Sequence, residues 1–125
     1  MRRVIYLLLL IFLIFQLAYA GISIADPNEW DFSRVKQGEV LKHDFIFKNE
    51  TKDVLNITGI NTSCGCTVSQ SDKKSLKPGE VTAIKVSFNS HGYLGEVKQF
   101  IYVNTDSAVL PIVKFTIKTE VVKKL

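Results

Sequence analysis

The chain is short: it has 125 residues, 46% of them hydrophobic, and a formal net charge of +4 at pH 7. This length suits one small domain. The lysines are spread along the sequence and do not form the concentrated basic face that a nucleic-acid-binding protein needs. We therefore expect no nucleic acid among its partners.

The first 20 residues have the pattern of an export signal. Met1-Arg2-Arg3 is a short basic start, Val4 to Phe15 is unbroken hydrophobic sequence, and Ala18-Tyr19-Ala20 matches the small residues that signal peptidase cleaves. The apolar run is shorter than the roughly 20 residues of a spanning helix. We predict a signal peptide at residues 1–20 and one domain at residues 21–125, with an uncleaved N-terminal anchor as the alternative.

Export determines the expected compartment and the chemistry of the cysteines. Cleavage after Ala20 would leave 105 of the 125 residues, and the loss of Arg2 and Arg3 would lower the net charge from +4 to +2. We expect the mature protein in the periplasm or at the cell surface, in contact with a membrane only if the signal stays attached. Disulfides persist outside the cytosol, so oxidised cysteines are plausible there.

Two segments in the first half of the domain have the character of strands. Residues 40–49 alternate in polarity with a period of two, and residues 54–62 are rich in β-branched side chains. The mostly apolar face of the first segment carries Leu41, His43, Phe45 and Phe47. A polar turn separates the two segments, so we expect them to pair as a hairpin with Phe45 near Ile57.

Three further strands are expected, at 82–88, 96–104 and 113–121. Lys77-Pro78-Gly79-Glu80 forms a turn before the first of them, because proline presets φ at the second turn position and glycine accepts a positive φ at the third. A loop with two glycines at 89–95 precedes the second. The expected core consists of Phe45, Phe47, Ile57, Ile84, Val86, Phe88, Ile101, Val103, Phe115 and Ile117. Such spacing predicts an all-β fold, an immunoglobulin-like antiparallel β-sandwich.

Four segments in order resemble a bacterial protein family. They are Trp30 to Glu39, Phe45 to Asn49, Ser63-Cys64-Gly65-Cys66-Thr67 and Lys77-Pro78-Gly79-Glu80. The chain resembles the bacterial domain-of-unknown-function family 1573, although Ser33 stands where that family usually carries glycine. The resemblance implies an exported or periplasmic immunoglobulin-like domain, related in fold to modules of motile sperm and cilia-associated proteins. It implies no established activity. We also expect Trp30 to pack in the core near the first strand.

Cys64 and Cys66 are the only cysteines, and Gly65 alone separates them. In an extended strand, residues two apart share a face and lie roughly 6.5 Å apart, near the upper limit for a disulfide. Gly65 allows a tighter, positive-φ conformation. The pair can be a readily reduced disulfide, a soft-metal clamp, or two inert packed residues. We expect it to be reachable by solvent rather than buried in the core.

A metal site is one of these alternatives. Two thiolates favour Cu(I) or Zn(II) over hard cations. His43 is the candidate third ligand of a Cys64-Cys66-His43 site, because the expected hairpin places it towards the end where the cysteines lie. The other interpretation of His43 is an ordinary half-buried strand histidine, and His91 lies in a loop where a solvated side chain is expected. We expect no other cofactor.

The sequence favours a binding or structural module over an enzyme. It contains no glycine-rich phosphate loop and no readable nucleophile–base spacing, and its carboxylates are scattered. We expect a module of unknown ligand whose partner is another exported protein or a cell-envelope component. The alternative is a protein that handles copper, zinc or thiols through Cys64 and Cys66.

Overall fold

The computed structural model describes residues 1–19 and 26–125. Helix α1 (Arg2–Tyr19) covers the apolar N-terminal run, and the expected cleavage point after Ala20 lies outside the described residues. Within the described ranges, no helix combines the length and the hydrophobicity of a membrane span. The strands are β1 (Glu29–Lys36), β2 (Val40–Lys48), β3 (Leu55–Thr62), β4 (Thr67–Ser71), β5 (Ser75–Leu76), β6 (Val81–Asn89), β7 (Gly95–Thr105) and β8 (Ile112–Val122).

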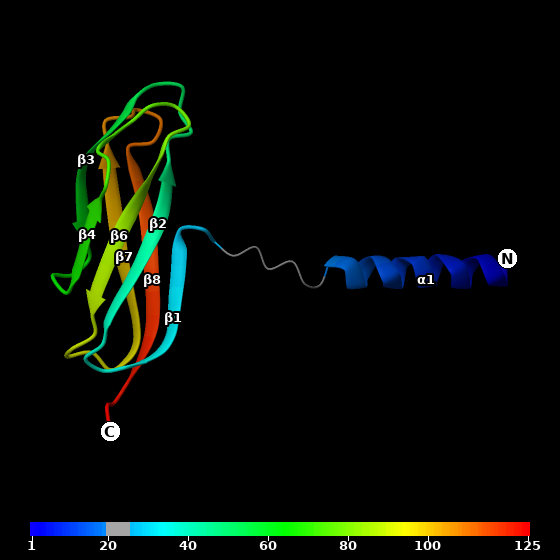
Figure 1. The fold of residues 1–125 in the computed structure, drawn as a ribbon. Helices are drawn as coiled ribbons and strands as arrows, with labels where there is room; N and C mark the ends of the chain where they lie inside the picture. Colours follow the sequence, from blue (N-terminus) through cyan, green and yellow to red (C-terminus); the bar gives the residue numbers. More distant parts are fainter. Residues whose placement is uncertain (20–25) are drawn as a thin grey trace.

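The strands form two sheets packed face to face (Figure 1). One sheet has the order β1-β8-β7-β3-β5 and the other the order β2-β6-β4. The predicted all-β sandwich is thus confirmed. Neighbouring strands are antiparallel with one exception: β1 runs parallel to β8, as the cyan and red strands of Figure 1 show. The chain leaves β1 through the turn at Gly38, whose φ is +97°, and enters the opposite sheet as β2.

The predicted hairpin between residues 40–49 and 54–62 is wrong. β2 pairs with β6, which places Phe45 opposite Ile84, whereas β3 pairs with β7 and β5 in the other sheet. Each segment has an apolar face. Two such faces can be buried against each other from opposite sheets, or they can lie side by side in one sheet and cover the core together. The connection after β2 therefore crosses between the sheets, and Phe45 and Ile57 contribute to the core from opposite sides.

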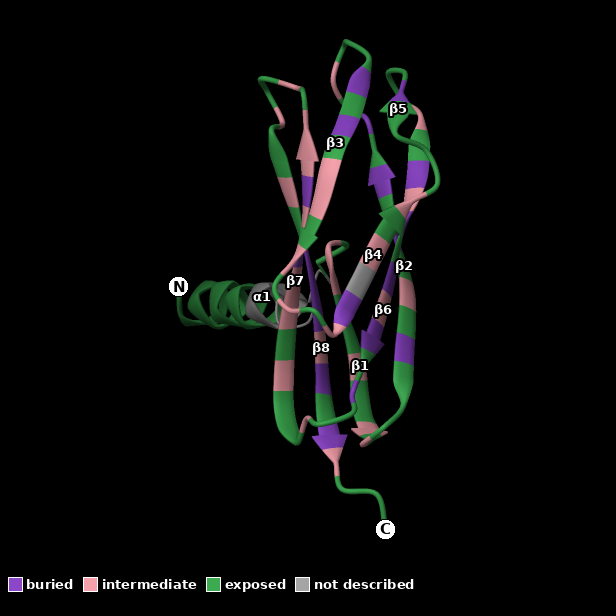
Figure 2. Cartoon of the chain, turned by 90° about the vertical axis from the view of Figure 1, so that its left-hand side faces the viewer, coloured by how far each residue is buried: buried purple, intermediate pink, exposed green. Residues whose placement is uncertain are grey.

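The hydrophobic core lies between the two sheets. All ten side chains that the sequence predicts for it are buried, and Leu41, Leu55, Leu76 and Val121 are buried as well. Buried and exposed positions alternate along β2 and β6 (Figure 2). This alternation is what a strand with one face on the core requires.

Trp30 is not a core residue. It lies on β1, is 44% exposed, and stacks on the imidazole of His43 with ring centroids 4.3 Å apart. Because β1 is an edge of one sheet and β2 an edge of the other, this aromatic pair covers the seam between the sheets. A large apolar side chain on an edge strand can remain partly exposed while still shielding the core.

Ser33 adopts a backbone conformation that favours glycine. Its φ is +64°, and the register of β1 against β8 shifts between Asp31 and Arg34. The amide of Ser33 donates to the carboxylate of Asp31 at 2.8 Å, and its carbonyl accepts from the hydroxyl of Thr119 at 2.9 Å. A left-handed residue at this bulge gives a physical reason for the glycine that the resembled family usually carries there.

Asn49 is a fully buried polar residue that organises the turn after β2. Its Nδ2 donates to the carbonyl oxygens of Leu76 and Asp53, both at 2.9 Å. Its Oδ1 accepts from the amide and the hydroxyl of Thr51, at 3.0 and 2.7 Å. All its side-chain hydrogen-bonding groups therefore have partners inside the protein, as buried polar groups need.

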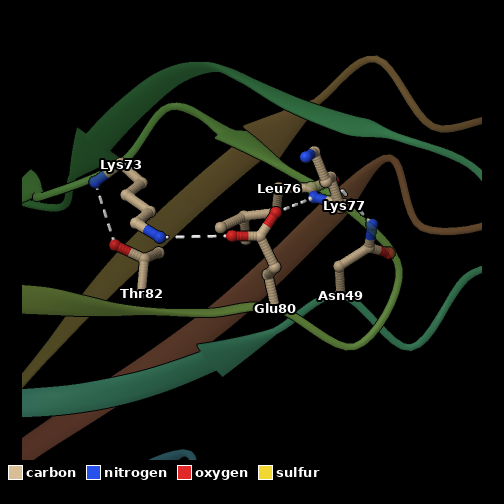
Figure 3. Close-up of polar contacts among 6 residues, drawn as sticks. All are labelled: Asn49, Lys73, Leu76, Lys77, Glu80 and Thr82. Carbon is tan, nitrogen blue, oxygen red and sulfur yellow. Dashed lines mark hydrogen bonds and ion pairs between the residues drawn. The ribbon is translucent and has the colours of Figure 1, made fainter.

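The Lys77-Pro78-Gly79-Glu80 turn forms as predicted and docks on Asn49 (Figure 3). Gly79 has a φ of +82°, and its amide donates to the carbonyl of Asn49 at 2.8 Å. The carboxylate of Glu80 accepts from the amide of Lys77 at 2.8 Å and from Nζ of Lys73 at 3.2 Å. These contacts, the backbone amide of Lys77 first, hold the pKa of Glu80 below its ordinary value.

We expect Glu80→Gln to weaken the dependence of stability on acid pH. Because the pKa of Glu80 is lowered by folding, its stabilisation is complete above the ordinary carboxyl pKa and is lost as the pH falls through the lowered value. Melting temperatures followed by circular dichroism from neutral pH down to about pH 3 should therefore fall less steeply in the variant than in the wild type. Glu50→Gln, in the neighbouring exposed turn, is the control and should keep the wild-type slope. Equal slopes for all three proteins would contradict the role of Glu80.

Candidate functional site

The cysteines lie in the connection from β3 to β4, where the chain passes from one sheet to the other. Cys64 and Cys66 form a disulfide with Cα atoms 5.3 Å apart. The amide of Thr67 donates to the carbonyl of Cys64 at 3.3 Å, so the segment is a turn rather than an extended strand. This turn brings the cysteines closer together than an extended strand would. Gly65 takes part in the turn without adopting the positive φ that glycine allows.

Polar groups surround both sulfur atoms. The Tyr93 hydroxyl oxygen lies 3.0 Å from Cys66 Sγ and 3.6 Å from Cys64 Sγ. The amide of Cys66 donates to Cys64 Sγ at 3.2 Å. The Thr67 hydroxyl oxygen lies 3.7 Å from Cys64 Sγ and 3.9 Å from Cys66 Sγ. The disulfide is therefore in contact with hydrogen-bond donors that could stabilise a thiolate.

Tyr93 is held in place by the loop between β6 and β7. Its amide donates to the carbonyl of Ser90 at 3.1 Å, its carbonyl accepts from Gln37 Nε2 at 3.0 Å, and its ring packs on Phe88 with centroids 5.3 Å apart. Ser90 is buried, and its hydroxyl donates to the carbonyl of Glu39 at 2.7 Å. The phenol is thus fixed by contacts with two strand connections. Sequence reasoning missed Tyr93, because nothing local links it to a cysteine 27 residues earlier.

The two cysteines differ in their surroundings. Both are half-buried, but Cys66 packs against the hydrophobic core, whereas Cys64 lies between the exposed residues Ser63 and Gly65. The core therefore covers part of Cys66, which also has the shorter contact with the Tyr93 hydroxyl.

The structure does not bring His43 to the cysteines. β2 and β4 are the outer strands of the three-stranded sheet, with β6 between them, and His43 stacks on Trp30 at the far seam. Burial lowers the pKa of His43, and the charge of Asp44 offsets part of this effect. His91 is exposed in its loop. Among the residues that the structure describes, no group of three His, Cys, Asp or Glu side chains is close enough to hold a metal ion.

A second surface feature lies on the outer face of the five-stranded sheet. Phe100 and Tyr102 on β7 point away from the core, are half-buried, and have ring centroids 6.4 Å apart. Nζ of Lys98 lies 5.7 Å and Nζ of Lys114 lies 5.0 Å from the centroid of the Phe100 ring. We call these four residues the Phe100 face. Within the described ranges, neither lysine has a carboxylate oxygen within 4.0 Å.

The lysines of this face are not neutralised by the strand pairing. Lys98 lies directly opposite Lys118 in the β7–β8 register, and like charges in this position destabilise a sheet. Lys118 is compensated by an ion pair with Glu29 on β1. A hollow of about 790 Å³ extends from Lys98 and Lys118 across β8 to β1, and Asp31, Glu96 and Glu120 also line it. Lys98 therefore lines a hollow of mixed charge.

Comparisons with solved structures support the fold. The chain is 17% identical to a protein of unknown function from Porphyromonas gingivalis W83, with a TM-score of 0.65 over 74% of this chain and 44% of that one. It is 14% identical to the VesB protease of Vibrio cholerae, with a TM-score of 0.58 over 74% of this chain and 29% of that one. The chain thus spans less than half the length of either protein.

A third solved structure matches over nearly its whole length. The ASH / PapD-like domain 7 of human CEP192 is 11% identical, with a TM-score of 0.58 over 85% of this chain and 94% of that one. At such low identity, these likenesses show an immunoglobulin-like fold and nothing of function. No curated protein matches the sequence.

The family described as "Protein of unknown function (DUF1573)" matches residues 24–121, from before β1 almost to the end of β8. The match covers most of the chain and confirms the resemblance to this family. The chain therefore belongs to the DUF1573 family.

Proposed function

We propose that the protein is an exported immunoglobulin-like binding module that engages an acidic partner through the Phe100 face. The observation that carries the proposal is the pair Lys98 and Lys114, which flank one aromatic ring on an outward sheet face without a carboxylate partner in the described ranges. Carboxylates of a partner would gain from the charges of the two ammonium groups, and apolar parts of the partner would pack on the rings.

Export is supported by the basic start, the apolar run and the small residues before Gly21. Two similar structures come from proteases of Vibrio cholerae, and one of these, VesC, is described as secreted. The match to VesC has a TM-score of 0.56 and covers only 21% of the VesC chain. A similar sandwich is thus a minor part of a secreted protein. This agrees with an exported module, whereas the acidic character of the proposed partner follows from the charges of Lys98 and Lys114 alone.

Removal of both lysines is expected to weaken binding to an acidic peptide about tenfold, because each exposed charge pair contributes roughly 0.5–1 kcal/mol. The probe is a fluorescein-labelled oligoglutamate peptide, and the measurement is fluorescence anisotropy at low salt. The variant is Lys98→Ala/Lys114→Ala. Salt should weaken the wild-type complex, since screening shortens the range of the attraction.

The matched control is Lys42→Ala/Lys48→Ala, which removes the same charge from exposed positions of β2 on the other sheet. It should bind like the wild type. Equal weakening in both double variants would mean that the peptide responds to net charge alone and would refute the Phe100 face as the site. Binding to phosphatidylglycerol vesicles but not to the peptide would also refute the proposal.

Signal cleavage is tested separately. When the full chain is produced with its own N-terminus in a bacterial host, N-terminal sequencing of the exported protein should begin at Gly21. Recovery of Met1 or Arg2 at the N-terminus in the membrane fraction would instead establish an anchor. Either result leaves the binding measurements above interpretable, because they use residues of the sandwich only.

A further inference from the structure

We infer that the Cys64–Cys66 disulfide is a thiol–disulfide exchange site, in which Cys64 is attacked and the Tyr93 hydroxyl stabilises Cys66 as the leaving sulfur. The inference does not depend on the Phe100 face. It uses three observations: the disulfide, the packing of Cys66 but not Cys64 against the hydrophobic core, and the phenol oxygen 3.0 Å from Cys66 Sγ.

Structural stabilisation is a weak explanation for this bond. A disulfide stabilises a protein mainly by restricting the unfolded chain, and the effect grows with the length of the closed loop. Here the loop contains only Gly65 between the two cysteines. The bond therefore restrains little of the unfolded chain, while a fixed phenol and two further donors are directed at its sulfurs.

The site of attack follows from the packing. An incoming thiolate approaches a disulfide along the S–S axis, from the side opposite the sulfur that leaves. Cys66 packs against the core and beneath Tyr93, whereas Cys64 lies between two exposed residues. Because the core and Tyr93 cover part of Cys66, we assign the attack from solvent to Cys64.

The reaction balances with a dithiol protein of the same compartment as reductant. Its thiolate forms a bond to Cys64 Sγ while the Cys64–Cys66 bond breaks, and the electron pair leaves on Cys66 Sγ. The Tyr93 O–H donates to this thiolate. The second thiolate of the reductant then attacks the reductant's first sulfur, which is bonded to Cys64 in the mixed disulfide. Cys64 is released as a thiolate and accepts a hydrogen bond from the Cys66 amide, which is 3.2 Å from Cys64 Sγ in the disulfide form. Both thiolates take protons from water. The reductant is oxidised to a disulfide, and Cys64–Cys66 is reduced by two electrons.

Tyr93 acts on the leaving group. Thiol exchange is faster when the leaving thiol has a lower pKa, and a hydrogen bond to the charged form lowers that pKa. The Thr67 hydroxyl lies near both sulfurs but at longer distances, 3.7 and 3.9 Å. Removal of the Tyr93 hydroxyl should therefore slow the release of Cys66 more than removal of the Thr67 hydroxyl.

The test is Tyr93→Phe in the full chain, which keeps the ring that packs on Phe88 and removes only the hydroxyl. We expect reduction by dithiothreitol, followed by alkylation and mass spectrometry without denaturant, to slow about three- to tenfold. In the reduced variant, the pH profile of Cys66 alkylation should shift to higher pH. Ser75→Ala removes an exposed hydroxyl from β5, which pairs with the end of β3 away from the cysteines, and should leave both readouts unchanged.

Two results would overturn the inference. The first is an unchanged rate and an unchanged Cys66 alkylation profile in Tyr93→Phe. The second comes from the wild-type protein: glutathione trapped as a mixed disulfide should be found on Cys64, and its presence on Cys66, or complete resistance of the folded protein to reduction, would refute the assigned direction and accessibility. Because the second measurement needs no variant, it decides the matter even if a substitution disturbs folding.

Discussion

Replacing Phe47 with alanine is expected to lower the free energy of unfolding by about 3–5 kcal/mol. Phe47 lies on β2, is 3% exposed, and belongs to the main hydrophobic cluster between the sheets. Its truncation removes apolar contacts and leaves a cavity that the surrounding strands can close only in part. Urea unfolding followed by circular dichroism measures the loss. The loss should be a large fraction of the total free energy of unfolding of a domain of this size.

The neighbouring residue provides the control for this prediction. Ile46 points to the outer face of the same strand and is 65% exposed. Ile46→Ala should change the stability by no more than about 0.5 kcal/mol. If Ile46→Ala cost more than Phe47→Ala, the face that β2 turns to the core would be reversed, since a one-residue shift exchanges the two faces of a strand.

The second large effect is expected at Asn49. Asn49→Ala should lower the free energy of unfolding by about 2–4 kcal/mol, because buried hydrogen bonds contribute roughly 1 kcal/mol each and unsatisfied buried groups cost more. The variant removes both amide donors to the carbonyls of Leu76 and Asp53 and the acceptor for Thr51. The turn after β2 and the Lys77-Pro78-Gly79-Glu80 turn would lose the side chain that joins them (Figure 3).

Asn49→Asp tests which part of the side chain matters. It keeps the shape and the acceptor but replaces the donor by oxygen, which would face two carbonyl oxygens, so we expect a loss at least as large near neutral pH. Asn61→Ala on the outer surface of β3 is the matched control and should be nearly neutral. A near-neutral Asn49→Ala would show that water replaces the side chain at these carbonyls and that the two turns are stable without it.

The core was predictable because alternation along a strand reports which side chains share a face. Phe45, Ile84 and Phe115 could each be assigned from their own segment. Strand pairing was not predictable in the same way. The apolar faces of β2 and β3 look alike whether the strands are neighbours or lie across the core, so the expected hairpin was wrong. Trp30 shows the same limit, since composition does not reveal that its strand forms a sheet edge.

The same distinction between local sequence features and long-range contacts applies to the candidate sites. Cys64 and Cys66 are two residues apart, so their proximity could be read from the sequence, whereas the contact with Tyr93 depends on how two loops meet. His43 was grouped with the cysteines through the hairpin that does not form. Phe100 and Tyr102 could be placed on the face opposite Val103, but the position of Lys114 over the ring required the β7–β8 register.

The most direct test of the proposed function is a titration of isotopically labelled protein with the oligoglutamate peptide, followed by amide chemical shifts. The account predicts saturable shifts concentrated on β7 and β8 around Phe100 and Lys114, with little change on β2 and β6. Shifts centred on the three-stranded sheet, or small shifts spread over all lysine-bearing strands without saturation, would contradict it.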